Sequence, residues 1–168
     1  MNPDELLMLM KERRSVRAYQ ETPVPQALIE KILEAARWCQ IASNVQPWRF
    51  IVVRNKGTIQ ALSKFAPYGR FISQAPVVIA IVADTKKAPK WYIYDTSMVS
   101  HQICLMTWAL GLGTCWIGSL DRDKAGELLH LKKGEFLTTI LPIGYPKEKQ
   151  LPPTSRKTLE DIVNYQNE

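Results

Sequence analysis

The sequence predicts an α+β fold, a three-layer α-β-α sandwich in which helices cover both faces of a mixed β-sheet. Helix-like and strand-like segments are interspersed along the chain, and the apolar run at 76–83, PVVIAIVA, has no polar face. A strand that is apolar on both sides should be central and covered on both faces. With 168 residues, the chain fits a single domain over residues 1–168.

The first part of the chain predicts two helices. Residues 3–13 carry leucines and methionines at near-helical spacing, behind Pro3 and Asp4, which suit a helix N-terminus. After the break ETPVP, apolar residues between 25 and 39 recur with a period of 3.6, which predicts an amphipathic helix.

Apolar runs and turn residues predict the remaining elements. The apolar positions of a long helix at 95–112 encircle it, so it should be buried in the core or against a second subunit. The other expected elements are strands at 48–54, 76–84, 114–120 and 136–146, helices at 56–66 and 121–131, and a short final helix after the Pro-Pro break at 152–153.

Composition excludes several classes of protein. The N-terminus places its charges after its apolar residues, unlike a secretory signal, and no apolar run approaches the roughly 20 residues that span a bilayer. Three widely spaced cysteines, Cys39, Cys104 and Cys115, fit reduced core thiols better than a disulfide framework. We therefore expect a cytoplasmic protein that does not span a membrane.

The formal net charge of +6 indicates an anionic partner without saying which. His101 and His130 lie far apart, and no cysteine or histidine pair has the spacing of metal ligands, so we predict no metal site. The segment GLGTCWIG at 111–118 lacks the lysine of a phosphate-binding loop and follows a helix, unlike a dinucleotide-binding turn.

Three alternating residues near the N-terminus form a candidate anion site. In extended backbone Arg13, Ser15 and Arg17 project to one side, about 7 Å between successive members. Two guanidinium groups and a hydroxyl can then hold one anion together. The alternative interpretation is a solvated basic helix end, because cations also favour a helix C-terminus.

Three further segments are weaker candidates. Asn44 and Gln46 offer amides to a heterocyclic ring edge, although turn chemistry explains them nearly as well. Residues 116–119 can present backbone N–H groups where Gly118 permits close approach, or form a plain bulge. The basic pair of Arg156 and Lys157 also fits a solvated surface.

Taken in order, these pieces resemble the nitroreductase family of FMN-dependent oxidoreductases. The matching segments cover nearly the whole chain, and RRSVR followed by NVQPW is the most specific combination. They are RRSVRAY at 13–19, SNVQPWRFIVV at 43–53, APVVIAIVAD at 75–84, GLGTCWIGSL at 111–120 and LPIGYP at 141–146. The sequence departs from the family at Gln40 and Ile41, where many members carry Pro-Ser.

The resemblance implies an intertwined homodimer with FMN at the subunit interface, and it assigns the site residues. Arg13, Ser15 and Arg156 would hold the phosphate, with Arg14 and Lys157 nearby. Arg17, assisted by Arg70, would reach the pyrimidine edge of the ring. Ser43 and Asn44, supported by Gln46, would contact the flavin from the other subunit. Trp116, Ile117, Gly118 and Ser119 would pass beside the ring, with the Gly118 N–H directed at N5.

The implied reaction is a ping-pong transfer. NADH or NADPH reduces FMN, and an electrophilic acceptor such as a nitroaromatic or quinone then takes the same place, with no catalytic side chain required. Another FMN-dependent dehydrogenase, a dehalogenase-like enzyme or a flavin carrier would use the same fold. A nucleic-acid-binding module is the remote alternative. Such a module should carry one continuous basic face, whereas the arginines here divide between two segments that are distant in sequence.

Overall fold

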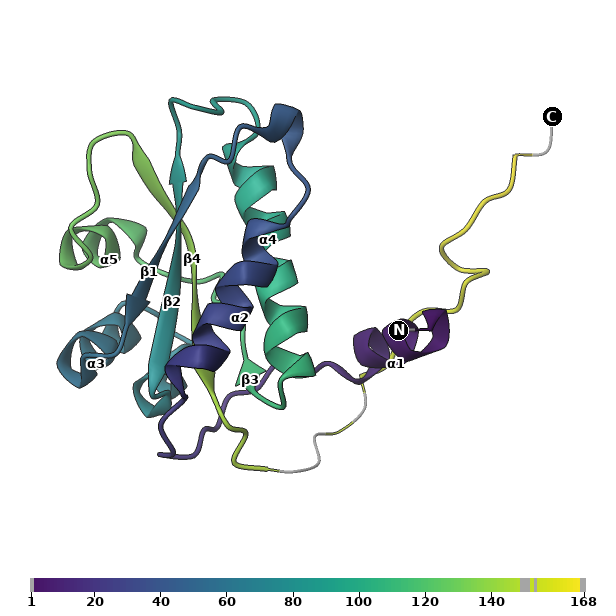
Figure 1. The fold of residues 1–168 in the computed structure, drawn as a ribbon, viewed down its shortest axis with the longest axis horizontal. Helices are drawn as coiled ribbons and strands as arrows, with labels where there is room; N and C mark the ends of the chain where they lie inside the picture. Colours follow the sequence, from purple (N-terminus) through teal and green to yellow (C-terminus); the bar gives the residue numbers. More distant parts are fainter. Residues whose placement is uncertain (1, 149–151, 153, 167–168) are drawn as a thin grey trace.

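Four strands form one antiparallel sheet in the order β1-β2-β4-β3. A computed structural model describes residues 2–148, 152 and 154–166 (Figure 1). The strands are β1 (Trp48–Val53), β2 (Val77–Asp84), β3 (Gly113–Thr114) and β4 (Glu135–Gly144). Pro153 of the predicted Pro-Pro break lies outside the described residues.

Helices cover both faces of this sheet. The helices α3 (Lys56–Lys64) and α5 (Arg122–Leu128) lie on one face, and α2 (Gln26–Arg37) and α4 (Tyr92–Ala109) lie on the other (Figure 1). Each layer closes its own apolar core, and β2 contributes alternate side chains to both. The predicted α+β sandwich is therefore confirmed, including the central position of the run at 76–84.

The prediction of a mixed sheet is wrong, because all pairs of named strands are antiparallel. The apolar run of β2 predicted a central strand covered on both faces and did not fix the direction of its neighbours. Here helical layers bury an antiparallel sheet. The described residues contain one isolated parallel contact, between Ser15 and Thr114.

The predicted strand at 114–120 is much shorter than expected. β3 ends at Thr114, and residues 115–119 form a loop beside β4. The carbonyl of Ile117 accepts a hydrogen bond from the Thr139 hydroxyl at 2.9 Å. A side chain therefore takes the place of the backbone hydrogen bond that a paired strand would make there. The apolar character of this loop reflects its packing in the core and not strand pairing.

The long helix α4 is only partly buried within one chain. Val99, Ile103 and Thr107 are fully buried on the sheet side, whereas Tyr94 and Met98 are exposed. The predicted burial in the core is therefore confirmed for one side of the helix. A second subunit is the expected partner of the exposed side of the helix.

The helix near the N-terminus and the described C-terminal segment lie to one side of the sandwich (Figure 1). The helix α1 (Pro3–Glu12) is capped by Asn2, whose side chain accepts from the Asp4 N–H at 2.7 Å, and it buries no residue. The predicted final helix is wrong: around Leu159 the chain forms a single turn. A helical segment this short is unstable in water without a packing surface. No helix in the described part of the chain could cross a membrane.

Candidate functional site

The segment after α1 is held in an extended conformation by two neighbours. The Val16 N–H donates to the Thr114 carbonyl at 2.9 Å, which places the segment beside β3. Further along, the Gln20 N–H donates to the Tyr145 carbonyl at 2.9 Å, beyond the end of β4. Residues 13–20 therefore continue the sheet without belonging to a named strand.

This extended backbone produces the predicted alternation. Val16 is buried, whereas Ser15 and Arg17 are exposed on the other side. Tyr19 is also buried, and its hydroxyl donates to the Val16 carbonyl at 2.7 Å. Burial and neighbouring thiols raise the pKa of Tyr19 well above its ordinary value, so it anchors the segment as a neutral phenol.

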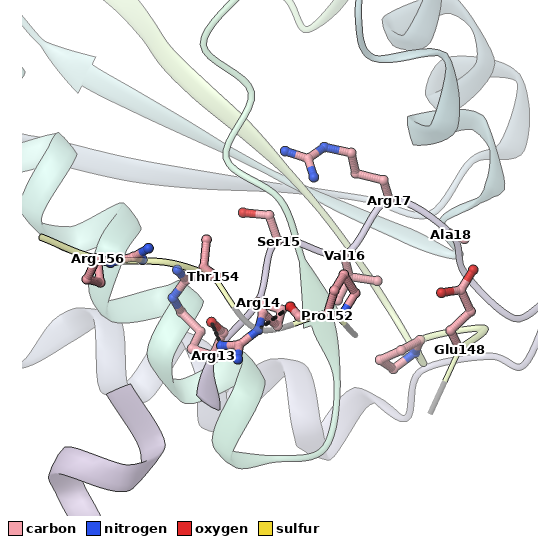
Figure 2. A pocket seen from close by; sticks show the side chains of 11 residues that line it. Arg13, Arg14, Ser15, Val16, Arg17, Ala18, Glu148, Pro152, Thr154 and Arg156 are labelled. Carbon is pink, nitrogen blue, oxygen red and sulfur yellow. Dashed lines mark hydrogen bonds between the residues drawn. The ribbon is translucent and has the colours of Figure 1, made fainter. Parts of the chain in front are cut away.

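The exposed side chains line a cavity of about 540 Å³. Four guanidinium groups and one carboxylate, that of Glu148, border it among the described residues (Figure 2). The guanidinium groups belong to Arg13, Arg14, Arg17 and Arg156. An excess of cations around one cavity, with the Ser15 hydroxyl among them, fits a multiply charged anion such as a phosphate monoester.

The arginines in this cavity are not equivalent. The Arg14 guanidinium donates to the carbonyls of Lys11, Arg13 and Pro152 at 2.7, 3.0 and 3.0 Å, so it ties the C-terminal segment to the end of α1. Figure 2 shows Arg13 near Arg156 at one end of the cavity. Arg14 therefore shapes the cavity, and the other guanidinium groups are better placed to bind an anion.

A second, smaller cavity of about 210 Å³ lies next to the first. Arg17 lines both cavities. The second cavity also receives all four residues of the predicted loop, Trp116, Ile117, Gly118 and Ser119, together with Tyr68 and Phe71. The two cavities thus place cations at one end and aromatic and backbone groups at the other, as a planar phosphorylated ligand requires.

Trp116 is fixed at the edge of the second cavity. Its indole Nε1 donates to the Oγ of the buried Ser100 in α4 at 2.9 Å, while 41% of the residue stays exposed. The ring also packs against Gly118, where an added Cβ would lie 3.1 Å from the Trp116 Cζ3. A side chain at Gly118 would therefore press on the ring, which is why the close approach requires glycine.

Five predicted site residues line neither cavity. Ser43, Asn44 and Gln46 lie together in the turn before β1, at the opposite end of α4 from residues 13–17 (Figure 1). Arg70 and Lys157 are exposed next to cavity residues without lining either cavity. The structure of one chain therefore brings together the predicted residues at 13–17, 116–119 and 156, and leaves the turn apart.

The turn at 42–46 has an unusual backbone. Ser43, Asn44 and Gln46 have φ angles of +51°, +53° and +51°, in the left-handed region that residues other than glycine seldom adopt. The Gln46 Nε2 donates to the Asn44 Oδ1 at 3.3 Å. Strained backbone of this kind is concentrated at ligand sites, so the turn stays a candidate for contacts across a subunit interface.

Sequence reasoning missed several cavity residues. Thr154 and Glu148 line the first cavity, and Tyr68 and Phe71 line the second. Tyr68 carried a usable signal, since a tyrosine between Pro67 and Gly69 sits in a turn and is 85% exposed. Thr154 and Glu148 carried none, because only the fold brings them to the arginines.

Two cysteines near the site, Cys104 and Cys115, are buried. Burial raises the pKa of Cys104 to about 12, and it also raises the pKa of Cys115, against the opposing effect of the Arg17 guanidinium. A thiol that stays protonated is a poor nucleophile. The described residues also contain no cluster of potential metal ligands.

The fold and the cavities define a class of protein: an α+β sandwich with a cationic cavity next to a second cavity lined by a loop and aromatic side chains. A model of the family described as "Putative TM nitroreductase" matches residues 5–168. The chain is 36% identical over 150 residues to a "Putative NADH dehydrogenase/NAD(P)H nitroreductase" from Methanothermobacter thermautotrophicus, covering 86% of this chain and 78% of the relative.

Solved structures agree with this match. An "FMN-dependent Nitroreductase" from Clostridium difficile has a TM-score of 0.88 and 30% identity, over 96% of this chain and 99% of that one. A "Putative NADH dehydrogenase/NAD(P)H nitroreductase" from Parabacteroides distasonis has a TM-score of 0.90 and 23% identity, over 96% of this chain and 98% of that one. This second structure supports the assignment of the fold alone. The chain belongs to the nitroreductase family of oxidoreductases, which confirms the resemblance drawn from its sequence.

Proposed function

We propose that this protein is an FMN-dependent oxidoreductase that passes a hydride from NADH or NADPH through flavin N5 to an electrophilic acceptor. The observation that carries the proposal is the position of Arg17, which lines both the cationic cavity and the cavity of residues 116–119. A ligand with a phosphate at one end and a planar ring at the other fits that arrangement. The name of the Clostridium difficile relative supports FMN as that ligand.

Each end of the site has a distinct role in this proposal. Arg13, Ser15 and Arg156 hold the phosphate through charge-assisted hydrogen bonds. Arg17 lies at the pyrimidine edge, where a cation stabilises the negative charge of reduced flavin and so raises its potential. The Gly118 N–H faces N5, and the neighbouring Trp116 bounds the ring. Arg14 and Lys157 contribute positive potential without direct contact.

FMN, when bound, supplies the redox chemistry, and the chain supplies orientation and charge. Hydride donor and acceptor would use the same face of the flavin in turn, no side chain need act as a nucleophile, and the proton that the reduced acceptor takes up would come from water. A nitroaromatic or a quinone is the proposed acceptor, and the nitroreductase names of the relatives support the first of these. The cytoplasm, where NADH and NADPH are available and thiols stay reduced, is the proposed location.

The functional unit in this proposal is a homodimer. Apolar side chains that one chain leaves exposed support it: Leu7 and Met10 in α1, Met98 in α4, and Ile162 and Tyr165 near the C-terminus. A second subunit would cover them and would bring Ser43 and Asn44, whose strained turn lies away from the cavities, to the flavin.

Anaerobic stopped-flow tests the proposed reaction and separates it from its alternatives. NADH or NADPH should bleach the bound FMN rapidly, and p-benzoquinone or a nitroaromatic should restore the colour. Steady-state rates should give parallel double-reciprocal lines, as a ping-pong sequence requires. A flavin carrier would show no rapid bleaching. A dehalogenase-like enzyme would be reoxidised by a halogenated aromatic and not by the quinone.

A further inference from the structure

A threonine in β4 holds the peptide group that joins Ile117 to Gly118. The Thr139 Oγ1 donates to the Ile117 carbonyl at 2.9 Å, and both residues are buried. The Arg122 Nη2 donates to the following carbonyl, that of Gly118, at 3.2 Å. Two side chains from outside the loop therefore fix consecutive carbonyl groups at this point.

The direction of the Gly118 N–H follows from the first of these bonds. In a planar trans peptide the C=O and the N–H point in opposite directions, and the described chain contains no cis peptide bond. Because the Ile117 carbonyl faces Thr139, the Gly118 N–H points away from Thr139. Within the described residues this N–H donates no hydrogen bond, and Gly118 lines the smaller cavity.

We propose that Thr139 is a positioning residue that aims the Gly118 N–H at flavin N5. The inference rests on the proposed function, because a flavin in the smaller cavity gives this N–H its partner. Without the hydroxyl, the buried Ile117 carbonyl would lose its donor, and the peptide could rotate to find another. The N–H would turn away from N5 with it, and N5 would lose a donor that polarises it for hydride acceptance.

The neighbouring threonine provides a matched control. The pairing of β2 with β4 passes from Ile81–Thr139 to Val82–Leu137, so Thr138 is the extra residue of a bulge. Thr138 is also buried, and its hydroxyl shares a hydrogen bond with the Thr96 hydroxyl in α4 at 2.7 Å. Threonine to valine removes one buried hydroxyl at either position, but within the described residues only the Thr139 hydroxyl donates a hydrogen bond to the loop.

The test compares Thr139→Val with Thr138→Val, each loaded with FMN labelled with ¹⁵N at N5. NMR detects the hydrogen bond directly, as a scalar coupling between the Gly118 amide nitrogen and N5. The wild type and Thr138→Val should show this coupling, and Thr139→Val should lose it. The rate constant for FMN reduction by NADH should fall roughly tenfold or more in Thr139→Val alone.

Two further variants keep the test decisive if Thr139→Val folds poorly. Thr139→Ser retains the hydroxyl and should keep the coupling, whereas Thr139→Cys, with a weak thiol donor, should reduce it. Coupling of wild-type size in Thr139→Val or in Thr139→Cys would overturn the inference, as would the absence of coupling from FMN-loaded wild type. Failure of the wild type to bind FMN would instead refute the proposed function.

Discussion

Val16 and Thr114 are joined by a backbone hydrogen bond of 2.9 Å, from the N–H of the first to the carbonyl of the second. This bond connects the arginine-rich segment near the N-terminus to the residue from which the loop at 115–119 begins. It therefore brings a basic segment and an apolar loop that are distant in sequence to the same pair of cavities.

Gly113→Ala should disrupt the junction. A Cβ at Gly113 would lie 2.5 to 2.8 Å from three side-chain atoms of Val16, which is β-branched and cannot easily move. We expect a loss of about 1 to 3 kcal/mol in the free energy of unfolding and weaker FMN binding. Thermal unfolding and FMN titration measure the two effects.

Two variants control for the added methyl group. Gly126→Ala places a Cβ in α5 at ordinary contact distance, 3.6 Å from Leu131, so it should be neutral or slightly stabilising. Val16→Ala combined with Gly113→Ala removes two of the three clashing atoms, the Val16 Cγ atoms, and keeps the Cβ, so it should restore only part of the FMN affinity. Equal affinities in wild type and Gly113→Ala would show that the junction does not organise the site.

Arg13→Ala and Arg156→Ala should each weaken FMN binding by about 1.5 to 3 kcal/mol, because each removes a charge-assisted bond to the phosphate. Titration of the apoprotein with FMN measures the loss of affinity. Riboflavin lacks the phosphate, so its affinity should fall less in the same variants. Lys31→Ala removes a charge from the exposed face of α2 and is the control. Equal losses for FMN and riboflavin would argue against a phosphate contact.

Arg17→Met should lower the midpoint potential of bound FMN. Removing the cation destabilises the reduced, negatively charged flavin, and a shift of about 30 mV corresponds to 1.4 kcal/mol for a two-electron couple. A dye-linked redox titration measures it. Arg70→Met is the matched comparison, since Arg70 lies outside both cavities. A shift in Arg70→Met alone would reassign the pyrimidine contact to Arg70.

Glu135→Gln should remove a pH-dependent contribution to stability. The Arg49 guanidinium hydrogen-bonds to Glu135 at 2.6 Å and lowers the pKa of that carboxyl from 4.5 to about 2. A lowered pKa stabilises the fold fully above about pH 4.5, and the contribution is lost as the pH falls towards 2. The Glu135 side chain is 15% exposed and that of Arg49 42%, so we expect only about 1 kcal/mol at pH 7.

Denaturant unfolding between pH 7 and pH 2 checks this contribution. The difference between wild type and Glu135→Gln should stay constant down to about pH 4.5 and then shrink. Glu127→Gln, which removes a carboxylate from an exposed position in α5, is the control for the substitution itself. A difference that does not change with pH would mean that the ion pair is not the source.

Elements with a clear period or an apolar run could be predicted from the sequence. The helix α2 and the strand β2 are of this kind, because local pattern and burial agree there. Strand direction could not be predicted, since helices on both faces bury an antiparallel sheet as well as a parallel one. Residues 115–119 could not be told from a strand, because their backbone is satisfied by side chains such as Thr139.

The candidate site was predictable to a similar extent. Ser15 and Arg17 project as their alternation predicted, because the neighbouring β3 and the residues after β4 keep the backbone extended. The role of Arg14 in holding Pro152 depends on a contact between the two ends of the chain and left no local pattern. Assignments to the turn at 42–46 depend on a second subunit and stay predictions.

The absorption spectrum of the purified protein shows whether the protein carries FMN. We expect a yellow protein with the absorption bands of bound flavin, which should lose its colour when FMN is removed and regain it when FMN is added back. A colourless protein that also fails to bind added FMN would contradict this expectation.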